Sequence, residues 1–523
     1  MSQSKSGQPR LAAGLLLAAL ALAPTAASAA STEPVARTEQ GLVRGLAVDG
    51  GRSFRDIPFA QPPVGDLRWR RPAPPAAWKG LRDATRFGLP CAQPDLGWNG
   101  VRETGSSEDC LDLNVWTPSA SRKPGLPVMV WIHGGAFEGG SGVDPMFDGS
   151  ALMRHGVVVV TVNYRLGVLG FLTHPDLDAE SPRHTSGDYG FYDQLSALHW
   201  VQRNIVRFGG DPRRVTIFGQ SAGSASVGAL MTSPLSKGLF HQSIMESGAP
   251  IGIGALQTTA QTEGAGRDWG SISDLRKLPA ADVIASWRKF ASADPGKRVA
   301  RPVVDGDVIP VSPDVAFATG AVRKMPSIIG NNARESLGPP NPAALHAFGR
   351  YADQAGAIYD KAAADPVEGD GAAQLATDTS FRCPTVMTQA FRASAGNAVY
   401  AYQFEQSLPG HEAMGAAHTF ELPYVFGNLS PSGFLGGAFI PVDHELSKTM
   451  QAFWTNFAKT GDPNGAGLPA WTRFRPGAAD YMVFADGRTR SSQGLHADVC
   501  ALYRQNWADE HHLPAAATGI ASR

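Results

Sequence analysis

Val215-Thr-Ile-Phe-Gly219-Gln220-Ser221-Ala222-Gly223 is the stretch that decides the fold of this chain. Four residues typical of a buried β-strand run into a serine that has one glycine two positions before it and another two positions after it. A turn this tight strains the backbone of its central residue and leaves no room for flanking side chains, which glycine satisfies. The residues after the turn can continue as a helix. The stretch therefore predicts a strand, a sharp turn that presents the Ser221 hydroxyl, and a helix.

The start of that helix suits a nucleophile. Its free backbone N–H groups and the positive end of its dipole face any oxyanion that forms at Ser221. A Gly-x-Ser-x-Gly pentapeptide alone arises by chance in a chain with 59 glycines. The strand before it and the helix after it favour a nucleophilic serine over a chance match.

The N-terminus has the pattern of a secretory signal peptide. Lys5 and Arg10 precede an apolar run over residues 11–22, and Ala27-Ser28-Ala29 follows as a small-residue cleavage site. We expect residues 1–29 to be removed and the protein to be secreted or periplasmic. An uncleaved anchor is disfavoured because the apolar run is shorter than the ~20 residues that span a bilayer. No later segment of the sequence predicts a membrane span.

The composition favours one large domain. No linker or internal repeat divides the chain, so we expect a single domain over residues 30–510 and a disordered tail over residues 511–523. The 46 Lys and Arg and 47 Asp and Glu give a net charge of −1 and are interleaved. This excludes the basic stripe of a nucleic-acid-binding protein and a polybasic patch for anionic lipid. We expect no cofactor and no metal, and the sequence indicates no oligomeric state.

Four cysteines in an exported chain predict disulfides. Three pairings are possible. Cys91 and Cys110 are close in sequence and form the natural local bridge, which leaves Cys383 with Cys500. In the chain-entropy model these bridges stabilise the fold by about 3 and about 5 kcal/mol. Four free thiols are the alternative, which the oxidising compartment disfavours.

Uninterrupted apolar stretches predict a central sheet. They include residues 110–115, 127–132 and 157–162, and long connections separate them, which indicates mostly parallel strands. Residues 190–208 have helical spacing and predict an amphipathic helix before the serine stretch. Residues 44–78 are rich in proline and predict an extended surface loop. The fold class is α/β, with a twisted, mostly parallel sheet flanked by helices.

A glycine pair follows the predicted strand that ends at Ile132. Gly134 and Gly135 would let bare backbone N–H groups approach a substrate, as the second arm of an oxyanion hole requires. Taken alone, the pair is better read as an ordinary glycine loop. Beside the serine turn, the oxyanion hole is the favoured interpretation.

A nucleophilic serine also needs a base and an acid that orients it. In doubly wound hydrolase sheets these follow later strands, in the chain order serine, acid, histidine. Glu246 and Glu335 both follow predicted strands, and Glu335 is favoured because the acid usually belongs to the later one. The loop after the predicted strand 398–404 holds His411 and His418, and position alone does not choose between them.

Three motifs resemble the type B carboxylesterase family of the α/β-hydrolase fold, which includes cholinesterases, carboxylesterases and bacterial para-nitrobenzyl esterases. They are the serine turn, Ser106-Ser107-Glu108-Asp109-Cys110-Leu111 and Phe208-Gly209-Gly210-Asp211-Pro212. The resemblance extends from about residue 43 to about residue 507. It implies that the histidine lies in a segment like His418-Thr-Phe-Glu-Leu-Pro-Tyr-Val-Phe-Gly427, which favours His418 over His411.

The resemblance places the acid in Gly330-Asn-Asn-Ala-Arg-Glu-Ser336, where Glu335 keeps the role. Arg334 stands there in place of the usual aspartate and Ser336 in place of the usual glycine. The resemblance also implies that Gly134, Gly135 and Ala222 donate the oxyanion N–H groups. It implies both disulfide pairs given above and a buried ion pair between Arg68 and Glu108.

Together these residues predict a carboxylic-ester hydrolase that acts on a small-molecule ester through a Ser-His-Glu triad and an acyl-enzyme. The alternatives are a lipase, a dedicated esterase for a bulky natural-product or polymer ester, and a non-catalytic binding protein like the neuroligins. Gln220 stands where cholinesterases carry glutamate, which disfavours a cationic choline ester. Residues 252–322 and 337–377 are expected to form a helical cap over the pocket. For Trp98, packing on the surface is favoured over a place in the pocket.

Overall fold

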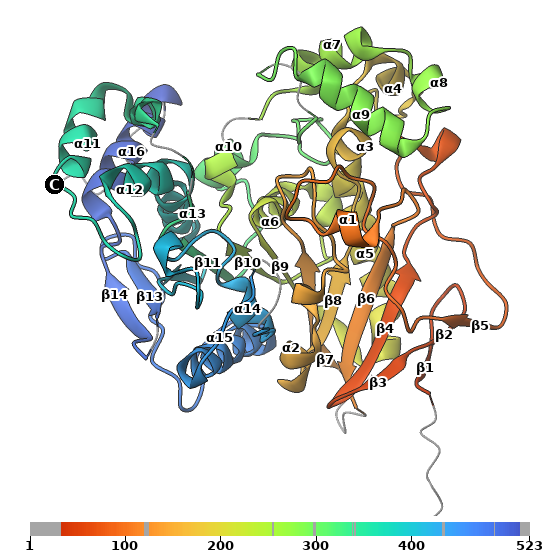
Figure 1. Ribbon diagram of the computed structural model, residues 1–523, viewed down its shortest axis with the longest axis horizontal. Coiled ribbons are helices and arrows are strands. Elements are labelled where there is room, and N and C mark those ends of the chain that lie inside the picture. Colours follow the sequence, from red (N-terminus) through yellow and green to blue (C-terminus); the bar gives the residue numbers. More distant parts are fainter. Residues whose placement is uncertain are drawn as a thin grey trace, which may run out of the picture. The chain divides into compact units, whose positions relative to one another are not determined.

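In the part of the chain that the computed structural model describes, an 11-stranded sheet has the order β14-β13-β12-β11-β10-β9-β7-β8-β6-β4-β3, and a separate small sheet has the order β1-β2-β5 (Figure 1). The strands are β1 (Val35–Arg37), β2 (Leu42–Arg44), β3 (Leu46–Val48), β4 (Gly51–Pro58), β5 (Leu81–Asp83), β6 (Asp112–Pro118), β7 (Leu126–Ile132), β8 (Val158–Val162), β9 (Gly210–Gln220), β10 (Gln242–Glu246), β11 (Ser327–Asn332), β12 (Val399–Phe404), β13 (Asp480–Phe484) and β14 (Arg490–Gln493).

The helices surround this sheet. They are α1 (Val101–Thr104), α2 (Ser150–Arg154), α3 (Gly167–Phe171), α4 (Pro175–Glu180), α5 (Tyr189–Asn204), α6 (Ala222–Thr232), α7 (Thr259–Trp269), α8 (Ile272–Leu275), α9 (Ala280–Ala291), α10 (Pro313–Thr319), α11 (Ala352–Tyr359), α12 (Gly371–Thr377), α13 (Cys383–Ser394), α14 (Leu422–Phe426), α15 (Pro441–Thr460) and α16 (Ala497–Glu510).

The structure describes residues 33–119, 125–253, 256–296, 300–336, 338, 341–430, 435–485 and 487–512. The predicted signal peptide, residues 1–29, lies outside them, and so do residues 513–523 of the predicted tail. From Pro34 onward the described residues form one compact unit. Among these residues, no helix combines the length and the apolar character that a membrane span requires.

The centre of the sheet is parallel, as the sequence predicts. Strands β8, β7, β9, β10, β11, β12 and β13 run parallel to one another, and the antiparallel pairs lie toward the two edges. Side chains of β7 alternate between two apolar clusters: Val128 and Val130 pack with residues of α5 and α6, and Met129 and Trp131 pack with residues of α15. The sheet thus separates two cores, each covered by helices.

The prediction of an extended surface loop over residues 44–78 is wrong for residues 46–48 and 51–58. These form β3 and β4, which pair antiparallel with each other, and β4 also pairs antiparallel with β6. The register shifts between Phe54 and Ile57, and both of these side chains are buried. This irregularity breaks the strict alternation that marks a strand in sequence, and the dense prolines begin only at Pro58. The sequence patterns also do not predict the short strands β1, β2 and β5, or strands β13 and β14.

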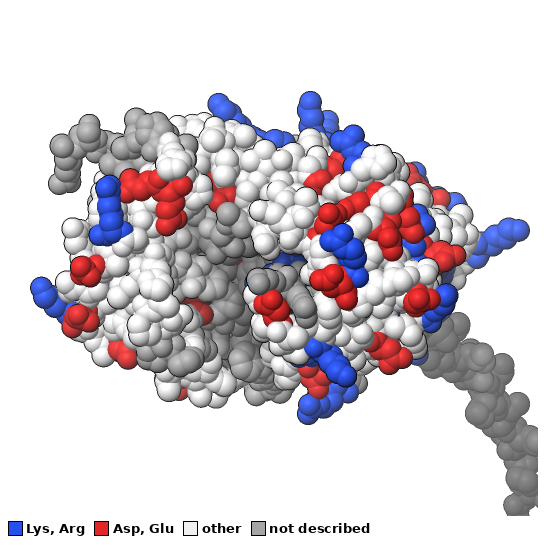
Figure 2. All heavy atoms as spheres, turned by 90° about the horizontal axis from the view of Figure 1, so that it is seen from above, with Lys and Arg blue, Asp and Glu red and all other residues white. Residues whose placement is uncertain are grey.

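The two long insertions occupy different places in Figure 1. Helices α7 and α9 of the first insertion contact α4 and α3 and lie above the carboxyl end of the sheet. The second insertion contributes α11 and α12, which pack with α16 in a separate cluster around Phe348. Positive and negative side chains are interspersed on the face shown in Figure 2.

Candidate active site

Three neighbouring strands end at one level and build the site. Ile132 of β7 pairs with Gly219 of β9, and Glu246 of β10 pairs with Gln220. Because these strands are parallel, their carboxyl ends meet at the same edge of the sheet. The register therefore brings the glycine loop after β7 beside the serine turn after β9.

Ser221 occupies a strained turn between β9 and α6. Its φ of +56° and ψ of −123° lie in a region that residues with a side chain rarely adopt. A Cβ on Gly219 would lie 2.6 Å from the Ile132 carbonyl oxygen, and one on Gly223 only 2.0 Å from it. The turn therefore requires both glycines, as the sequence predicts.

The glycine loop lies directly against Ser221. A Cβ on Gly134 would lie 3.1 Å from the Ser221 Cβ, so only bare backbone fits there. Gly135 has a φ of +111°, and a Cβ on it would lie 2.1 Å from the Gly139 carbonyl oxygen. Ala222 is the first residue of α6, where backbone N–H groups have no partner within the helix. Gly134 and Ala222 therefore border Ser221 from two sides.

His133 supports this loop, a role that the sequence analysis did not assign. Its Nδ1 lies 2.8 Å from the Gly134 carbonyl oxygen, and its ring stacks on Tyr164 at a centroid distance of 4.4 Å. The Tyr164 hydroxyl donates to the His133 carbonyl oxygen at 2.9 Å. Burial lowers the pKa of His133 to about 4, so the ring is neutral at neutral pH. An uncharged imidazole thus fixes the backbone next to the serine.

The predicted acid and base are hydrogen-bonded to each other. The Nδ1 atom of His418 lies 2.6 Å from Oε2 of Glu335. The other oxygen of Glu335 accepts the backbone N–H of Asn332 at 2.6 Å, and the Glu335 N–H donates to the Thr377 hydroxyl at 3.1 Å. The Glu335 carboxylate is fully buried. These contacts fix the ring orientation of His418 and turn its Nε2 away from the acid.

Electrostatics at His418 favour the protonated ring. Burial alone would lower its pKa, but the charge of Glu335 and the hydrogen bond to it act in the opposite direction, and Glu421 adds to their effect. The pKa of His418 is raised above its ordinary value of 6.5 as a result. Glu335 therefore stabilises the imidazolium that forms when this ring accepts a proton.

The two competing residues take no part in the hydrogen-bonded pair of His418 and Glu335. Glu246 is buried at the end of β10, where it accepts a hydrogen bond from the Trp454 indole at 2.7 Å. Burial, with Glu421 nearby, raises the pKa of Glu246 well above its ordinary range. His411 precedes the short 3₁₀ turn Glu412–Met414 and packs near Phe420.

Gln220 makes a contact that the sequence analysis missed. Its side-chain Nε2 lies 3.1 Å from Nε2 of His418, the ring nitrogen opposite the acid. Among the described residues, no hydrogen-bond partner is found for the Ser221 hydroxyl. Catalytic hydrogen bonds often form only when substrate binds. Local sequence gives no signal for this contact, because it joins residues 198 positions apart.

A cavity of about 430 Å³ opens above the serine. Ser221, Phe137, Arg301 and Phe381 are among the residues that line it. The Phe381 ring also lies 5.1 Å from the His418 ring, so the cavity and the acid–base pair share this side chain. Residues of the second insertion that the structure describes do not line this cavity.

The matches to known proteins cover nearly the whole chain. The sequence profile described as Carboxylesterase family matches residues 32–341 and 350–503. A fumonisin B1 esterase of Sphingopyxis macrogoltabida is 41% identical, over 94% of this chain and 93% of that protein. A para-nitrobenzyl esterase of Bacillus subtilis is 36% identical, over 83% of this chain and 91% of that protein.

The chain belongs to the carboxylesterase family. A solved para-nitrobenzyl esterase structure superposes with a TM-score of 0.79 at 32% identity, over 90% of this chain and 99% of that one. A carboxylesterase of Geobacillus stearothermophilus gives a TM-score of 0.75 at 33% identity, over 90% and 99% of the two chains. These similarities confirm the α/β-hydrolase fold and the class of enzyme, a serine carboxylesterase that acts on small-molecule esters.

Further features expected from this carboxylesterase resemblance are present. Arg68 is buried and makes two hydrogen bonds to the Glu108 carboxylate, at 2.7 and 2.6 Å. The structure contains the disulfides Cys91–Cys110 and Cys383–Cys500.

Trp98 is 50% exposed. Its ring packs on the glycine loop, where it would lie 3.0 Å from a Cβ on Gly135. Among the described residues of this carboxylesterase, no group of three or more His, Cys, Asp and Glu side chains is placed to hold a metal.

Proposed function

We propose that this carboxylesterase hydrolyses esters through the triad Ser221, His418 and Glu335 and an acyl-enzyme intermediate. The observation that carries the proposal is the setting of Ser221. It lies at a strained turn, lines a cavity and is bordered by the bare backbone of Gly134 and the first residue of α6. The hydrogen-bonded pair His418–Glu335 supports the assignment of base and acid.

In the proposed reaction, the Ser221 oxygen attacks the ester carbonyl carbon while Nε2 of His418 takes the hydroxyl proton. The carbonyl oxygen becomes an oxyanion, which accepts hydrogen bonds from the backbone N–H groups of Gly134, Gly135 and Ala222, each worth roughly 3 to 4 kcal/mol. The imidazolium then gives its proton to the leaving alcohol as the C–O bond breaks. Water repeats these steps on the acyl-enzyme and releases the acid and free Ser221.

Before attack, the Gln220 side chain must move away from Nε2 of His418. Its amide contacts the nitrogen that the mechanism needs as a base, at 3.1 Å. Rotation of the Gln220 side chain or a small shift of the ring would free Nε2 for the serine proton. In the proposal, this rearrangement accompanies substrate binding, when catalytic hydrogen bonds often form.

A dedicated esterase for a bulky natural-product ester is the second candidate. The specific observation in its favour is the 41% identity to a protein named fumonisin B1 esterase. A non-catalytic binding protein is disfavoured, because Ser221, Glu335 and His418 are all present.

Replacing the nucleophile tests the proposal. We expect Ser221→Ala to fold normally and to hydrolyse 4-nitrophenyl esters near the background rate, whereas the parent enzyme turns them over. The matched control is Ser224→Ala, three residues along α6. The Ser224 hydroxyl is buried and has no hydrogen-bond partner among the described residues, so its loss should leave folding and turnover intact. Equal turnover by purified Ser221→Ala and the parent enzyme would refute the assignment.

We also infer that the protein is exported. Residues 1–29 have the signal-peptide pattern, and both disulfides are typical of an oxidising compartment. N-terminal sequencing of protein recovered outside the cytoplasm should begin near residue 30. An intact N-terminus on that material would contradict cleavage.

A further inference from the structure

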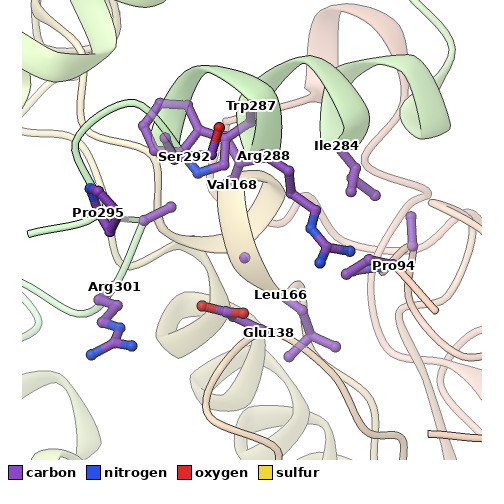
Figure 3. A pocket seen from close by; sticks show the side chains of 14 residues that line it. Pro94, Glu138, Leu166, Val168, Ile284, Trp287, Arg288, Ser292, Pro295 and Arg301 are labelled. Carbon is purple, nitrogen blue, oxygen red and sulfur yellow. The ribbon is translucent and has the colours of Figure 1, made fainter. Parts of the chain in front are cut away.

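A second cavity, of about 320 Å³, lies beneath the first insertion. Helix α9 forms one wall with Ile284 and Trp287, and Val168 of α3 contributes to another. These walls are largely apolar. The charged residues that line the cavity are Glu138, Arg288 and Arg301. In Figure 3, Arg288 extends from α9 into the cavity, while Glu138 and Arg301 approach from below in this view.

Arg301 connects this cavity to the one above the serine. It lines both of them, with Ser221 in one and Arg288 in the other. The two cavities therefore adjoin at Arg301.

The three charged side chains lack partners in the described part of the chain: none of them forms a hydrogen bond or an ion pair there. Other arginines near the site are engaged, since Arg68 binds Glu108 and Arg165 binds Asp193. Glu138, Arg288 and Arg301 are all exposed residues, and two guanidinium groups beside one carboxylate give the lining of the second cavity a net positive charge. A guanidinium presents N–H donors in a planar fork that matches a carboxylate.

We propose that the substrate of this enzyme carries a free carboxylate in addition to its ester bond, and that Arg301, assisted by Arg288, binds it. The carboxylate lies where the two cavities adjoin, and the apolar walls of the second cavity pack against the part of the substrate next to it. This inference rests on the proposed function at Ser221 and names the substrate class for that site. Arg301 and Arg288 are thus residues that determine specificity, and neither takes part in the bond-breaking steps.

Two pairs of substrates test the charge preference. In the first pair the charge is on the acyl side: mono-4-nitrophenyl adipate is compared with 4-nitrophenyl hexanoate, which has an equally long acyl chain. In the second pair it is on the alcohol side: 4-acetoxybenzoate is compared with 4-methylphenyl acetate. The measured quantity is the ratio of kcat/KM for the charged ester to kcat/KM for the neutral one, in the parent enzyme and in the variants.

We expect this ratio to fall about tenfold or more in Arg301→Gln, in at least one of the two pairs, because a hydrogen-bonded charge pair is lost. Arg288→Gln should lower it less, and Arg301→Lys should restore part of it. The matched control is Lys289→Gln, which removes the exposed charge next to Arg288 on α9, outside the cavity lining, and should leave the ratio unchanged. High salt should lower the ratio in the parent enzyme.

Two outcomes separate the inference from the proposed function. If the parent enzyme hydrolyses the neutral esters but Arg301→Gln has the same ratio as the parent in both pairs, the carboxylate inference is wrong and the proposed function stands. If the parent enzyme and Ser221→Ala hydrolyse the neutral esters equally, the proposed function fails, and the inference fails with it.

Discussion

His418 lies close to two buried carboxylates with different roles. Glu335 binds its Nδ1 directly. Glu421 is three residues further along the chain, binds the Asn332 side chain at 2.5 Å and raises the pKa of His418 from a distance. Burial and the nearby charge of Glu335 raise the pKa of Glu421 itself to about 7. The charge beside the proposed base therefore changes within the pH range in which the enzyme would work.

This arrangement predicts the pH dependence of activity. The proposed base must be neutral, and the pKa of His418 is raised above 6.5, so kcat/KM should rise with pH through an inflection above 6.5. Glu421→Gln removes a negative charge that stabilises the imidazolium, so the inflection should move to lower pH. Glu412→Gln is the control, because Glu412 is an exposed acid in the preceding loop. An inflection that stays in place in Glu421→Gln would contradict this account of His418.

Local sequence predicts some of these residues and not others. Ser221 and Glu335 follow strands, so their positions can be read from strand patterns. His411 and His418 share one loop, and no pattern of propensities separates them; the family resemblance does. The contacts of Gln220 and Glu421 depend on how distant segments fold together, which the sequence pattern does not record.

At the scale of elements, the site depends on the close packing of β7, β9 and the start of α6. Gly223 is the tightest point, because a Cβ there would overlap the Ile132 carbonyl oxygen at 2.0 Å. Backbone on both sides blocks relaxation. The position of the turn that presents Ser221 is therefore fixed relative to the loop that carries Gly134.

Gly223→Ala should displace the serine turn relative to the Gly134 loop. We expect a loss of about 2 kcal/mol or more in the free energy of unfolding, from overpacking against backbone, together with reduced kcat. Urea denaturation and steady-state kinetics measure the two effects. Gly296→Ala is the control, since a Cβ there would meet nothing within 4 Å. A Gly223→Ala enzyme with unchanged stability and kcat would show that the turn is not as tightly packed as described.

The elements that were predicted from sequence share one property. Strands β8, β11 and β12 are buried at every position, as are β7 from Pro127 and β9 from Val215, and each carries a run of apolar residues that predicts a buried strand. Strand β4 is interrupted by an irregularity next to a proline-rich stretch, and β14 is an exposed edge strand of Arg-Ser-Ser-Gln. Both strands form because they pair with neighbouring strands, and the β-propensity of their own residues contributes less.

At the scale of the whole molecule, hydrogen bonds, ion pairs and a disulfide connect the C-terminal part of the chain to the loop that carries Glu335. Arg382 is fully buried, pairs with Asp378 and donates to the Ala333 carbonyl oxygen at 2.5 Å. His496, next to α16, binds Asp378 at 2.8 Å and Glu368 at 3.3 Å. The disulfide Cys383–Cys500 joins α13 to α16 beside this network. Distant chain segments thereby support the position of Glu335.

This network predicts a pH-dependent stability. Burial alone would lower the pKa of His496, but hydrogen bonds to Asp378 and Glu368 raise it to about 9. A raised pKa stabilises the fold fully below about pH 6.5, and the contribution is lost as pH rises through about 9. The free energy of unfolding should therefore fall over this range, by up to about 3 kcal/mol from His496.

Chemical denaturation of the parent enzyme and His496→Gln at pH 6 and pH 9.5 measures this contribution. The variant should be less stable at the lower pH and should differ little from the parent at the higher one. His444→Gln, at an exposed histidine of α15, is the control. Parallel pH dependence in the parent and His496→Gln would rule out the role of this histidine.

Rapid-quench mass spectrometry detects the proposed covalent intermediate on Ser221. The parent enzyme is mixed with a slowly deacylating 4-nitrophenyl ester, quenched in acid within the first turnover and digested. We expect a burst of nitrophenol equal to the enzyme concentration and an acyl group on the peptide that contains Ser221. A linear time course without a burst, or an acyl group on a different residue, would contradict the proposed intermediate.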